Sequence, residues 1–297
     1  IGQVVSAAGD VAVEALGSIT EGKVEGADLS FVAGGGIALD IDSAGVVSAQ
    51  AVHDIALNET AGDLLLGLVS SAGAVQLTAA GAIRDHEAVS IQAAAAVLDA
   101  GAGIGASDNA LGTAVGALEA HAGRGALWLV NSGALDVGEV TADGEVSIIT
   151  LSPLTVSGDI VGESVYLEAA DTDGPGDDLT VQAGASITAT AGNVVLVAGD
   201  DLVVEAGSAV SAQGQVSLSA GANLELSGVI DADSLSITGS DGDNVITITQ
   251  VTTITNVQAL GGNDTVVVGG GSVDAIGELL LVDGGDGSDV LRIDETA

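Results

Sequence analysis

The chain has 297 residues, and its 42 acidic residues outnumber its four lysines and arginines so far that the formal net charge is −38. Nucleic acids and anionic membrane surfaces are bound by clustered basic residues, so this composition excludes both as partners. Hydrophobic residues make up 47% of the chain, which argues against the disorder that an acidic composition can otherwise produce. No apolar run is long enough for insertion into a membrane.

The composition also limits the kind of core. Only three aromatic residues occur, Phe31, Trp128 and Tyr166, so Val, Ile, Leu and Ala have to fill the interior. A thin interior of small aliphatic side chains suits this composition better than a thick globular core, in which aromatic residues supply much of the buried area. The sequence has no cysteine and therefore no disulfides, and because it also has no methionine we expect a fragment of a longer chain.

Residues 1–98 contain short runs in which apolar and polar residues alternate, for example at 10–13, 28–32 and 75–79. Alternation with a period of two places the apolar side chains on one face of a strand. We interpret residues 1–98 as degenerate coils of a solenoid whose repeat is clearer further along the chain.

Residues 99–125 interrupt this pattern. The spacing of their apolar residues predicts a short helix or an ordered loop near residues 107–122 that projects from the coils. The residues with this helical spacing are Leu111, Ala114, Val115, Leu118 and Ala122.

The run 101–106 matches the dinucleotide-binding pattern G-x-G-x-x-A. A chain with 45 glycines is expected to contain such a match by chance, and no alternating strand–helix units follow it. We therefore interpret the run as a Gly/Ala-rich turn before the excursion.

The clearest repeat lies in residues 126–238. The run at 178–184 recurs at 201–207 and again at 223–228. A unit this short cannot bury its own apolar face, whereas stacked units form a continuous interior. An antiparallel sandwich also has short strands, but it lacks such a fixed repeat and normally uses more aromatic residues. We predict an all-β fold, a parallel β-helix (β-solenoid) with about 22 residues per coil.

Residues 239–297 resemble haemolysin-type calcium repeats, whose pattern is G-G-x-G-x-D-x-U-x with U a large apolar residue. Residues 284–292 match it fully, 261–266 match its later half and 239–246 are weaker. The resemblance implies β-helix coils with Ca²⁺-binding turns, although the family's motifs follow in tandem whereas Asp264 and Asp289 are separated by about one whole coil. The ligands that it implies are Asp264 and Asp289, with Asp243, Asn244 and Asp286 as further candidates.

An electrostatic argument for cations is independent of this family. Acids at equivalent turns of stacked coils would lie about 4.8 Å apart. Like charges at that distance cost slightly under about 1 kcal/mol in water and about 3–4 kcal/mol at an effective dielectric of 20. A ladder of such pairs favours bound divalent cations, and Ca²⁺ prefers oxygen ligands. For Asp178, Asp200 and Asp201 we favour the simpler interpretation, a solvated acidic face with diffuse counterions.

A second resemblance concerns giant bacterial exoproteins. Residues 103–105, 109–115, 118–120 and 125–131 are similar to a module of large adhesins related to filamentous haemagglutinin, in which long β-helical repeats surround the module. This resemblance implies a structural or adhesive rod in an extracellular filament or on a cell surface. Its partners would be further repeats of the same giant chain or other copies of itself, together with divalent cations.

The alternative function is that of a carbohydrate-active β-helix enzyme, a polysaccharide lyase or hydrolase. Four scattered basic residues cannot line a groove for acidic sugars, and three aromatic residues provide few platforms for sugar rings. No H-E-x-x-H, cysteine ligand set or G-x-S-x-G motif is present, so we predict that the chain is not an enzyme. The threonines Thr247, Thr249, Thr252 and Thr253 form a local cluster rather than the regular array that ice binding requires.

Overall fold

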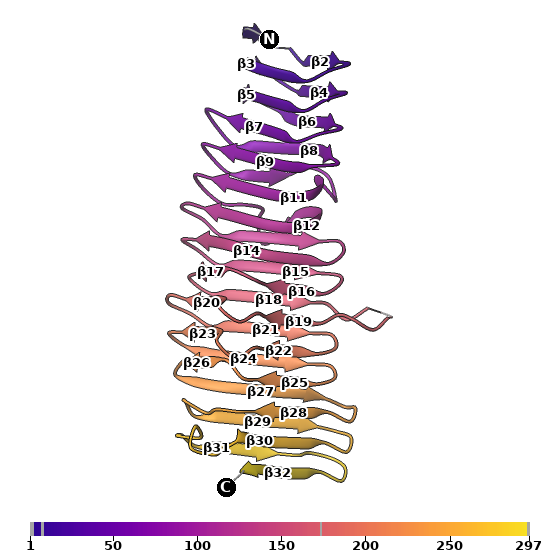
Figure 1. Cartoon of the computed structure of the whole chain (residues 1–297). Coiled ribbons are helices and arrows are strands. Elements are labelled where there is room, and N and C mark those ends of the chain that lie inside the picture. Colours follow the sequence, from indigo (N-terminus) through magenta and orange to yellow (C-terminus); the bar gives the residue numbers. More distant parts are fainter. Residues whose placement is uncertain (1–2, 7–8, 173, 296–297) are drawn as a thin grey trace. The chain divides into compact units, whose positions relative to one another are not determined.

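The computed structural model describes residues 3–6, 9–172 and 174–295, and in these residues the regular secondary structure is entirely β-strand. The strands form two compact units, which are described separately. The N-terminal unit comprises Ile1–Leu135 and Val140–Ile148, and the C-terminal unit comprises Asp136–Glu139 and Ile149–Ala297. In each unit, strands pair in parallel with strands of the next coil, as Figure 1 shows. Both units are therefore parallel β-solenoids, which confirms the predicted fold class.

The N-terminal unit contains β1 (Gln3–Val5), β2 (Val11–Ala15), β3 (Ile19–Gly26), β4 (Leu29–Ala33), β5 (Ile37–Ser43), β6 (Val46–Ala51), β7 (Ile55–Glu59), β8 (Leu64–Ser71), β9 (Ala74–Ala79), β10 (Ile83–Asp85), β11 (Ile91–Ala100), β12 (Leu111–Ala122) and β13 (Leu127–Asn131). Two further strands, β14 (Leu135–Ala142) and β15 (Val146–Thr150), contribute residues to both units.

The C-terminal unit contains β16 (Leu154–Val156), β17 (Asp159–Gly162), β18 (Val165–Ala169), β19 (Leu179–Val181), β20 (Ser186–Ala189), β21 (Val194–Ala198), β22 (Leu202–Val204), β23 (Ala209–Ala212), β24 (Gln215–Ala220), β25 (Leu224–Leu226), β26 (Val229–Asp231), β27 (Ser234–Ser240), β28 (Val245–Ile248), β29 (Thr255–Leu260), β30 (Thr265–Gly271), β31 (Leu280–Asp283) and β32 (Val290–Glu295).

The interior of each unit consists of columns of aliphatic side chains. In each strand every second side chain points inward. Because the strands of successive coils pair in parallel and in register, inward aliphatic residues of one coil lie directly beside those of the next. In the N-terminal unit one such column is Leu39, Leu57, Leu77 and Leu98. In the C-terminal unit the predicted repeat aligns as Leu179, Leu202 and Leu224, all at most 2% exposed.

The coil length varies along the chain. In the N-terminal unit Asp40 and its register partner Asn58 are 18 residues apart in the sequence. In the C-terminal unit the turn residues Asp201 and Asn223, which are hydrogen-bonded across one coil, are 22 residues apart. The predicted coil length thus describes the regular coils of the C-terminal unit, whereas N-terminal coils such as that of Asp40 are shorter.

The helix predicted near residues 107–122 is wrong, because Leu111–Ala122 is the strand β12. Its inward side chains change parity: Leu111, Thr113 and Val115 are buried, and after a corner the buried residues are Leu118, Ala120 and Ala122. The buried residues repeat every second position on each side of the corner, but Val115 and Leu118 at the corner are three positions apart. This single three-residue step resembles the spacing of a helix. The segment forms a strand because it pairs in parallel with β11, from Ile91↔Thr113 to Ala100↔Ala122.

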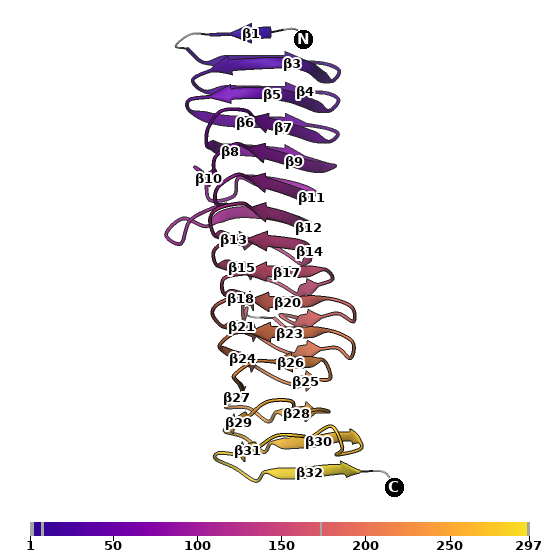
Figure 2. The same ribbon diagram turned by 90° about the vertical axis from the view of Figure 1, so that its left-hand side faces the viewer.

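An ordered loop does occur, but it precedes this strand. Residues 101–110 connect β11 to β12. Ile104 stays within the stack, where it is buried and bridges to Ile83 and Leu127. The part of the connection that follows Ile104 projects from the coils (Figure 2). An antiparallel bridge between Ala106 and Asn109 closes the loop, and the Asn109 side chain donates a hydrogen bond to the Asp85 carbonyl at 3.0 Å. Among the residues that the structure describes, no helix has the length and hydropathy needed to span a membrane.

Candidate functional sites

Three of the residues predicted to bind calcium stack in consecutive coils of the C-terminal unit. Asn244, Asp264 and Asp289 directly precede β28, β30 and β32. Oδ1 of Asp264 accepts a hydrogen bond from the Asn244 N–H at 2.8 Å, and Oδ1 of Asp289 accepts one from the Asp264 N–H at 3.1 Å. Each carboxylate therefore reaches back and caps the backbone of the coil before it.

Asp264 is the unusual member of this stack. Its side chain is only 1% exposed, and its second carboxylate oxygen, Oδ2, is buried without a hydrogen-bond partner. Asn244 is equally buried, but its amide is fully engaged by the Ser240 N–H and the Ala222 carbonyl. A buried carboxylate oxygen without a partner is energetically costly, so it identifies a place where a cation would stabilise the fold.

The other two predicted ligands lie elsewhere. Oδ1 of Asp243 accepts hydrogen bonds from the backbone N–H and the side-chain amide of Asn263, at 2.6 and 3.2 Å. Asp286 is exposed and bridges to the preceding coil through its backbone, by bonds with Leu260 and Gly262. In the described parts of the chain, no three His, Cys, Asp or Glu side chains converge into a group that could hold a metal ion.

Turn acids throughout both units hold the next coil in place. In the N-terminal unit the Asp28 carboxylate accepts the Val46 N–H, and the Asp54 carboxylate accepts the Ala74 N–H, both at 2.8 Å. In the C-terminal unit Asp178 accepts the N–H of Asp201, which in turn accepts that of Asn223. The interpretation of Asp178 and Asp201 as a merely solvated face therefore omitted a structural role.

Asn131 is a buried polar residue that sequence reasoning missed. It ends β13, so the neighbouring Val115 on β12 has no backbone partner on that side. The Asn131 amide replaces that partner: Oδ1 accepts the Val115 N–H at 2.9 Å, and Nδ2 donates to the Val115 carbonyl at 3.2 Å. Two further bonds, with the Thr113 hydroxyl and the Gly133 carbonyl, complete the site. A lone Asn after alternating apolar residues was the available signal.

Glu59 is a second buried polar residue without a sequence signal. It stands in an inward column between Ile41 and Ala79 and is 1% exposed. Its carboxylate accepts the N–H groups of Ser43 and Ala61, at 2.8 and 3.1 Å. Burial raises the pKa of Glu59 above its ordinary value, although the two backbone hydrogen bonds act in the opposite direction.

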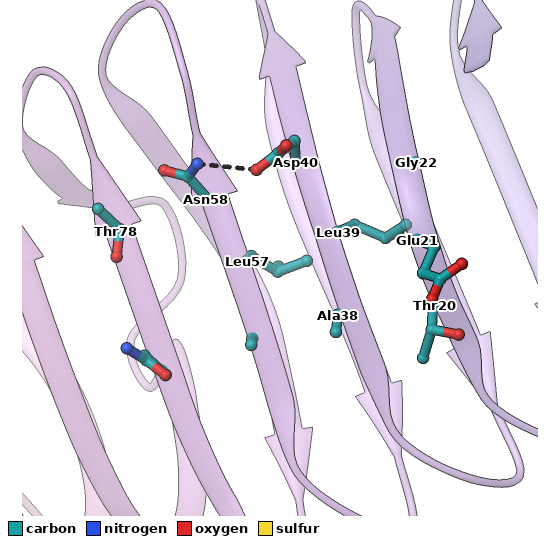
Figure 3. A pocket seen from close by; sticks show the side chains of 11 residues that line it. Thr20, Glu21, Gly22, Ala38, Leu39, Asp40, Leu57, Asn58 and Thr78 are labelled. Atoms are coloured by element: carbon teal, nitrogen blue, oxygen red, sulfur yellow. Dashed lines mark hydrogen bonds between the residues drawn. The ribbon is translucent and has the colours of Figure 1, made fainter. Parts of the chain in front are cut away.

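A groove of about 410 Å³ crosses β3, β5, β7 and β9 of the N-terminal unit (Figure 3). Leu39 and Leu57 border the groove but are only 5% and 2% exposed, because their side chains turn to the interior of the unit. The other lining residues are Thr20, Glu21, Gly22, Ala38, Asp40, Ala56, Asn58, Gln76 and Thr78. The Asn58 amide donates to Asp40 Oδ1 at 2.8 Å, which fixes one carboxylate on the rim (Figure 3).

A bulge in β3 lies at one edge of the groove. Thr20 pairs with Ala38 and Lys23 pairs with Asp40, so Glu21 and Gly22 together oppose the single residue Leu39. Glu21 has φ 61° and Gly22 has φ 144°, conformations that extended strands do not use. Bulges of this kind redirect side chains, and here the strand contributes no leucine to the column that continues as Leu39 and Leu57.

Comparison of the chain with protein-family models, with curated proteins and with solved structures found no match in any of the three. The function therefore has to be inferred from the turns and the groove themselves.

Proposed function

We propose that the chain is a structural or adhesive module of a secreted bacterial surface or matrix protein and forms part of an extracellular filament. The observation that carries this proposal is the use of turn side chains. Asp28, Asp54, Asp178 and Asp201 each bind a backbone N–H of the next coil. Such residues strengthen the stacking between coils, as a rod under mechanical tension requires.

The interior supports the same proposal. Successive coils repeat aliphatic residues in register, for example Val194 with Val216 and Leu196 with Leu218. Repeated coils of this kind can be added without changing their neighbours. The similarity of residues 103–105, 109–115, 118–120 and 125–131 to giant bacterial adhesins supports an extracellular location.

The proposed partners are further repeats of the same giant chain or other copies of it. In β32, Leu291 pairs with Val266 and Ile293 with Val268, so both occupy positions that are inward in the coil before. Each is 56% exposed. These two side chains form the apolar surface that an additional coil would cover.

The alternative, a carbohydrate-active enzyme, has less support. Acid catalysis on sugars uses a carboxyl group with a raised pKa beside a cleft. Burial does raise the pKa of Glu59, but Glu59 is enclosed by its own unit and does not line the groove.

The structural proposal predicts that coils can be inserted. Leu179 and Leu224 occupy the same column, so duplicating residues 179–223 adds two coils in register. We expect the enlarged chain to fold and to lengthen by roughly 10 Å in small-angle X-ray scattering. Electron micrographs of the native material should show rods or fibres. Compact globules in the micrographs, or an insertion that prevents folding, would contradict the proposal.

We also propose that Ca²⁺ stabilises the turns of the C-terminal unit. The support is the partnerless Oδ2 of Asp264 in a stack that Asn244 and Asp289 extend. Asp264 and Asp289 would be the carboxylate ligands, with backbone carbonyls and water completing the shell that Ca²⁺ prefers. A bound cation would neutralise the buried charge.

Thermal unfolding in Ca²⁺ and in EDTA tests this proposal. A ligand present at 100 times its dissociation constant stabilises the folded state by about 2.7 kcal/mol. We expect Ca²⁺ to raise the midpoint of the wild-type chain and not that of Asp264→Asn. In EDTA the variant should be at least as stable as the wild type, because it has no buried charge. Equal unfolding midpoints of the wild type in Ca²⁺ and in EDTA would refute stabilisation by calcium.

A further inference from the structure

One column of turn residues runs through six consecutive coils of the C-terminal unit. The register of the strands that follow these turns aligns its members. The members are Asp177, Asp200, Ala222, Asn244, Asp264 and Asp289. The column therefore contains two pairs of aspartates in neighbouring coils, Asp177 with Asp200 and Asp264 with Asp289.

The two pairs share the same cross-coil hydrogen bond. Oδ2 of Asp200 accepts the Asp177 N–H at 3.1 Å, and Oδ1 of Asp289 accepts the Asp264 N–H at 3.1 Å. The first aspartate of each pair is buried, since Asp177 is 4% exposed and Asp264 is 1% exposed. Each pair thus encloses one carboxylate that needs a compensating partner.

The protein itself supplies that partner in the first pair. Oδ2 of Asp177 accepts hydrogen bonds from the Thr172 N–H at 2.8 Å and from the Thr172 hydroxyl at 2.7 Å. Thr172 lies in the long connection between Ala169, the end of β18, and Leu179, the start of β19. Charge-assisted hydrogen bonds of this kind offset the cost of burying the carboxylate without a cation.

The second pair lacks such a donor. Oδ2 of Asp264 is buried without a hydrogen-bond partner. Thr172 stands five residues before Asp177, whereas the residue five positions before Asp264 is Ala259, which is part of β29 and has no hydroxyl. The shorter connection between β29 and β30 therefore places no residue in the position of Thr172.

Asn244 ends the acidic part of the column on the other side of Asp264. Its amide is neutral and is already bonded to the Ser240 N–H and the Ala222 carbonyl. Asn244 therefore carries no charge for a cation to offset.

We propose that the chain binds one calcium ion, held by Asp264 and Asp289, and that Thr172 takes the place of a second ion at Asp177 and Asp200. This inference rests on the proposed stabilisation by Ca²⁺, and it adds the number of ions and the residue that limits it. The spacing of the acids alone would favour ions at both pairs. The pairs differ in the buried oxygen, which hydrogen bonds satisfy in Asp177 and leave without a partner in Asp264.

Isothermal titration of the full chain with CaCl₂ measures the number of sites. About 150 mM NaCl screens diffuse binding to the acidic surface. We expect one saturable site in the wild type and none in Asp264→Asn. The matched control Asp177→Asn should keep one site, with an affinity within about two-fold of the wild type.

The outcomes separate this inference from the role of calcium as such. Two sites in the wild type, or loss of the site in an Asp177→Asn chain that keeps the wild-type circular dichroism spectrum, would overturn the inference and leave stabilisation by calcium standing. A wild type without any saturable site would overturn both.

A second variant tests the role of Thr172. Thr172→Val removes the hydroxyl donor and keeps the shape of the side chain, so Oδ2 of Asp177 retains only the backbone N–H of residue 172. We expect this variant to bind a second calcium ion, at least about ten-fold more weakly than the first, whereas Thr172→Ser keeps the hydroxyl and binds one. A single site in Thr172→Val would refute the role of Thr172.

Discussion

Replacing Asn131 with alanine removes the one side chain that completes the edge of β12. The side chain is fully buried and makes four hydrogen bonds, two of them to the backbone of Val115. After Asn131→Ala, the Val115 N–H and carbonyl lose their partners in a part of the core that water does not reach. Each buried polar group left without a partner costs about 1–3 kcal/mol, so we expect a loss of roughly 2–6 kcal/mol in the free energy of unfolding.

Urea unfolding followed by tryptophan fluorescence measures this loss. Trp128 is the only tryptophan and lies on β13, the strand that Asn131 ends, so the signal reports on this region. The matched control is Asn58→Ala in the same unit, where an exposed Asn makes a single side-chain bond to Asp40. We expect the control to change the free energy by no more than about 0.5 kcal/mol. If Asn131→Ala is no more costly than the control, the amide does not replace a strand partner and the reasoning is refuted.

Three further predictions concern the core, pH and the turns. Leu196→Ala empties a fully buried position and should cost about 2–5 kcal/mol by urea unfolding monitored by circular dichroism; a smaller cost would indicate a loosely packed column. Because the pKa of Glu59 is raised, its contribution to stability grows as pH falls from 7 through the folded pKa toward the ordinary value of 4.5. Glu59→Gln should therefore flatten the rise of the melting temperature over this interval, and an unchanged slope would contradict the assignment. Gly285 has φ 81° and a Cβ there would meet the Leu260 carbonyl, so Gly285→Ala should lower the melting temperature, whereas the open Gly62 should accept alanine without loss; equal effects would rule out this account of the turn.

Much of the fold follows from patterns that are local in the sequence. The runs beginning at Asp178, Asp201 and Asn223 predict stacked coils, and the structure places Leu179, Leu202 and Leu224 in one column. Alternation of apolar and polar residues determines which side chains point inward, because the backbone of a strand leaves no other choice.

The candidate sites were less predictable, and the reason is geometric. The motif at Asp264 and Asp289 marked two turns correctly, but only the coordinates show one carboxylate capping the other's backbone and an oxygen left without a partner. The bulge at Glu21 and Gly22 is defined by its mismatch with β5 in the next coil, and the sequence of β3 alone does not show it.

By itself, the sequence determined the class of the fold, the aliphatic interior and the acidic exterior, because each depends on residue type and a period of two. The tertiary structure decided that Leu111–Ala122 is a strand, that the Asn131 amide hydrogen-bonds the backbone of Val115, and where the groove lies. Those outcomes depend on which residues of successive coils come into register. The spacing of such partners is not constant along the chain, so register is set by packing between coils rather than by any local pattern.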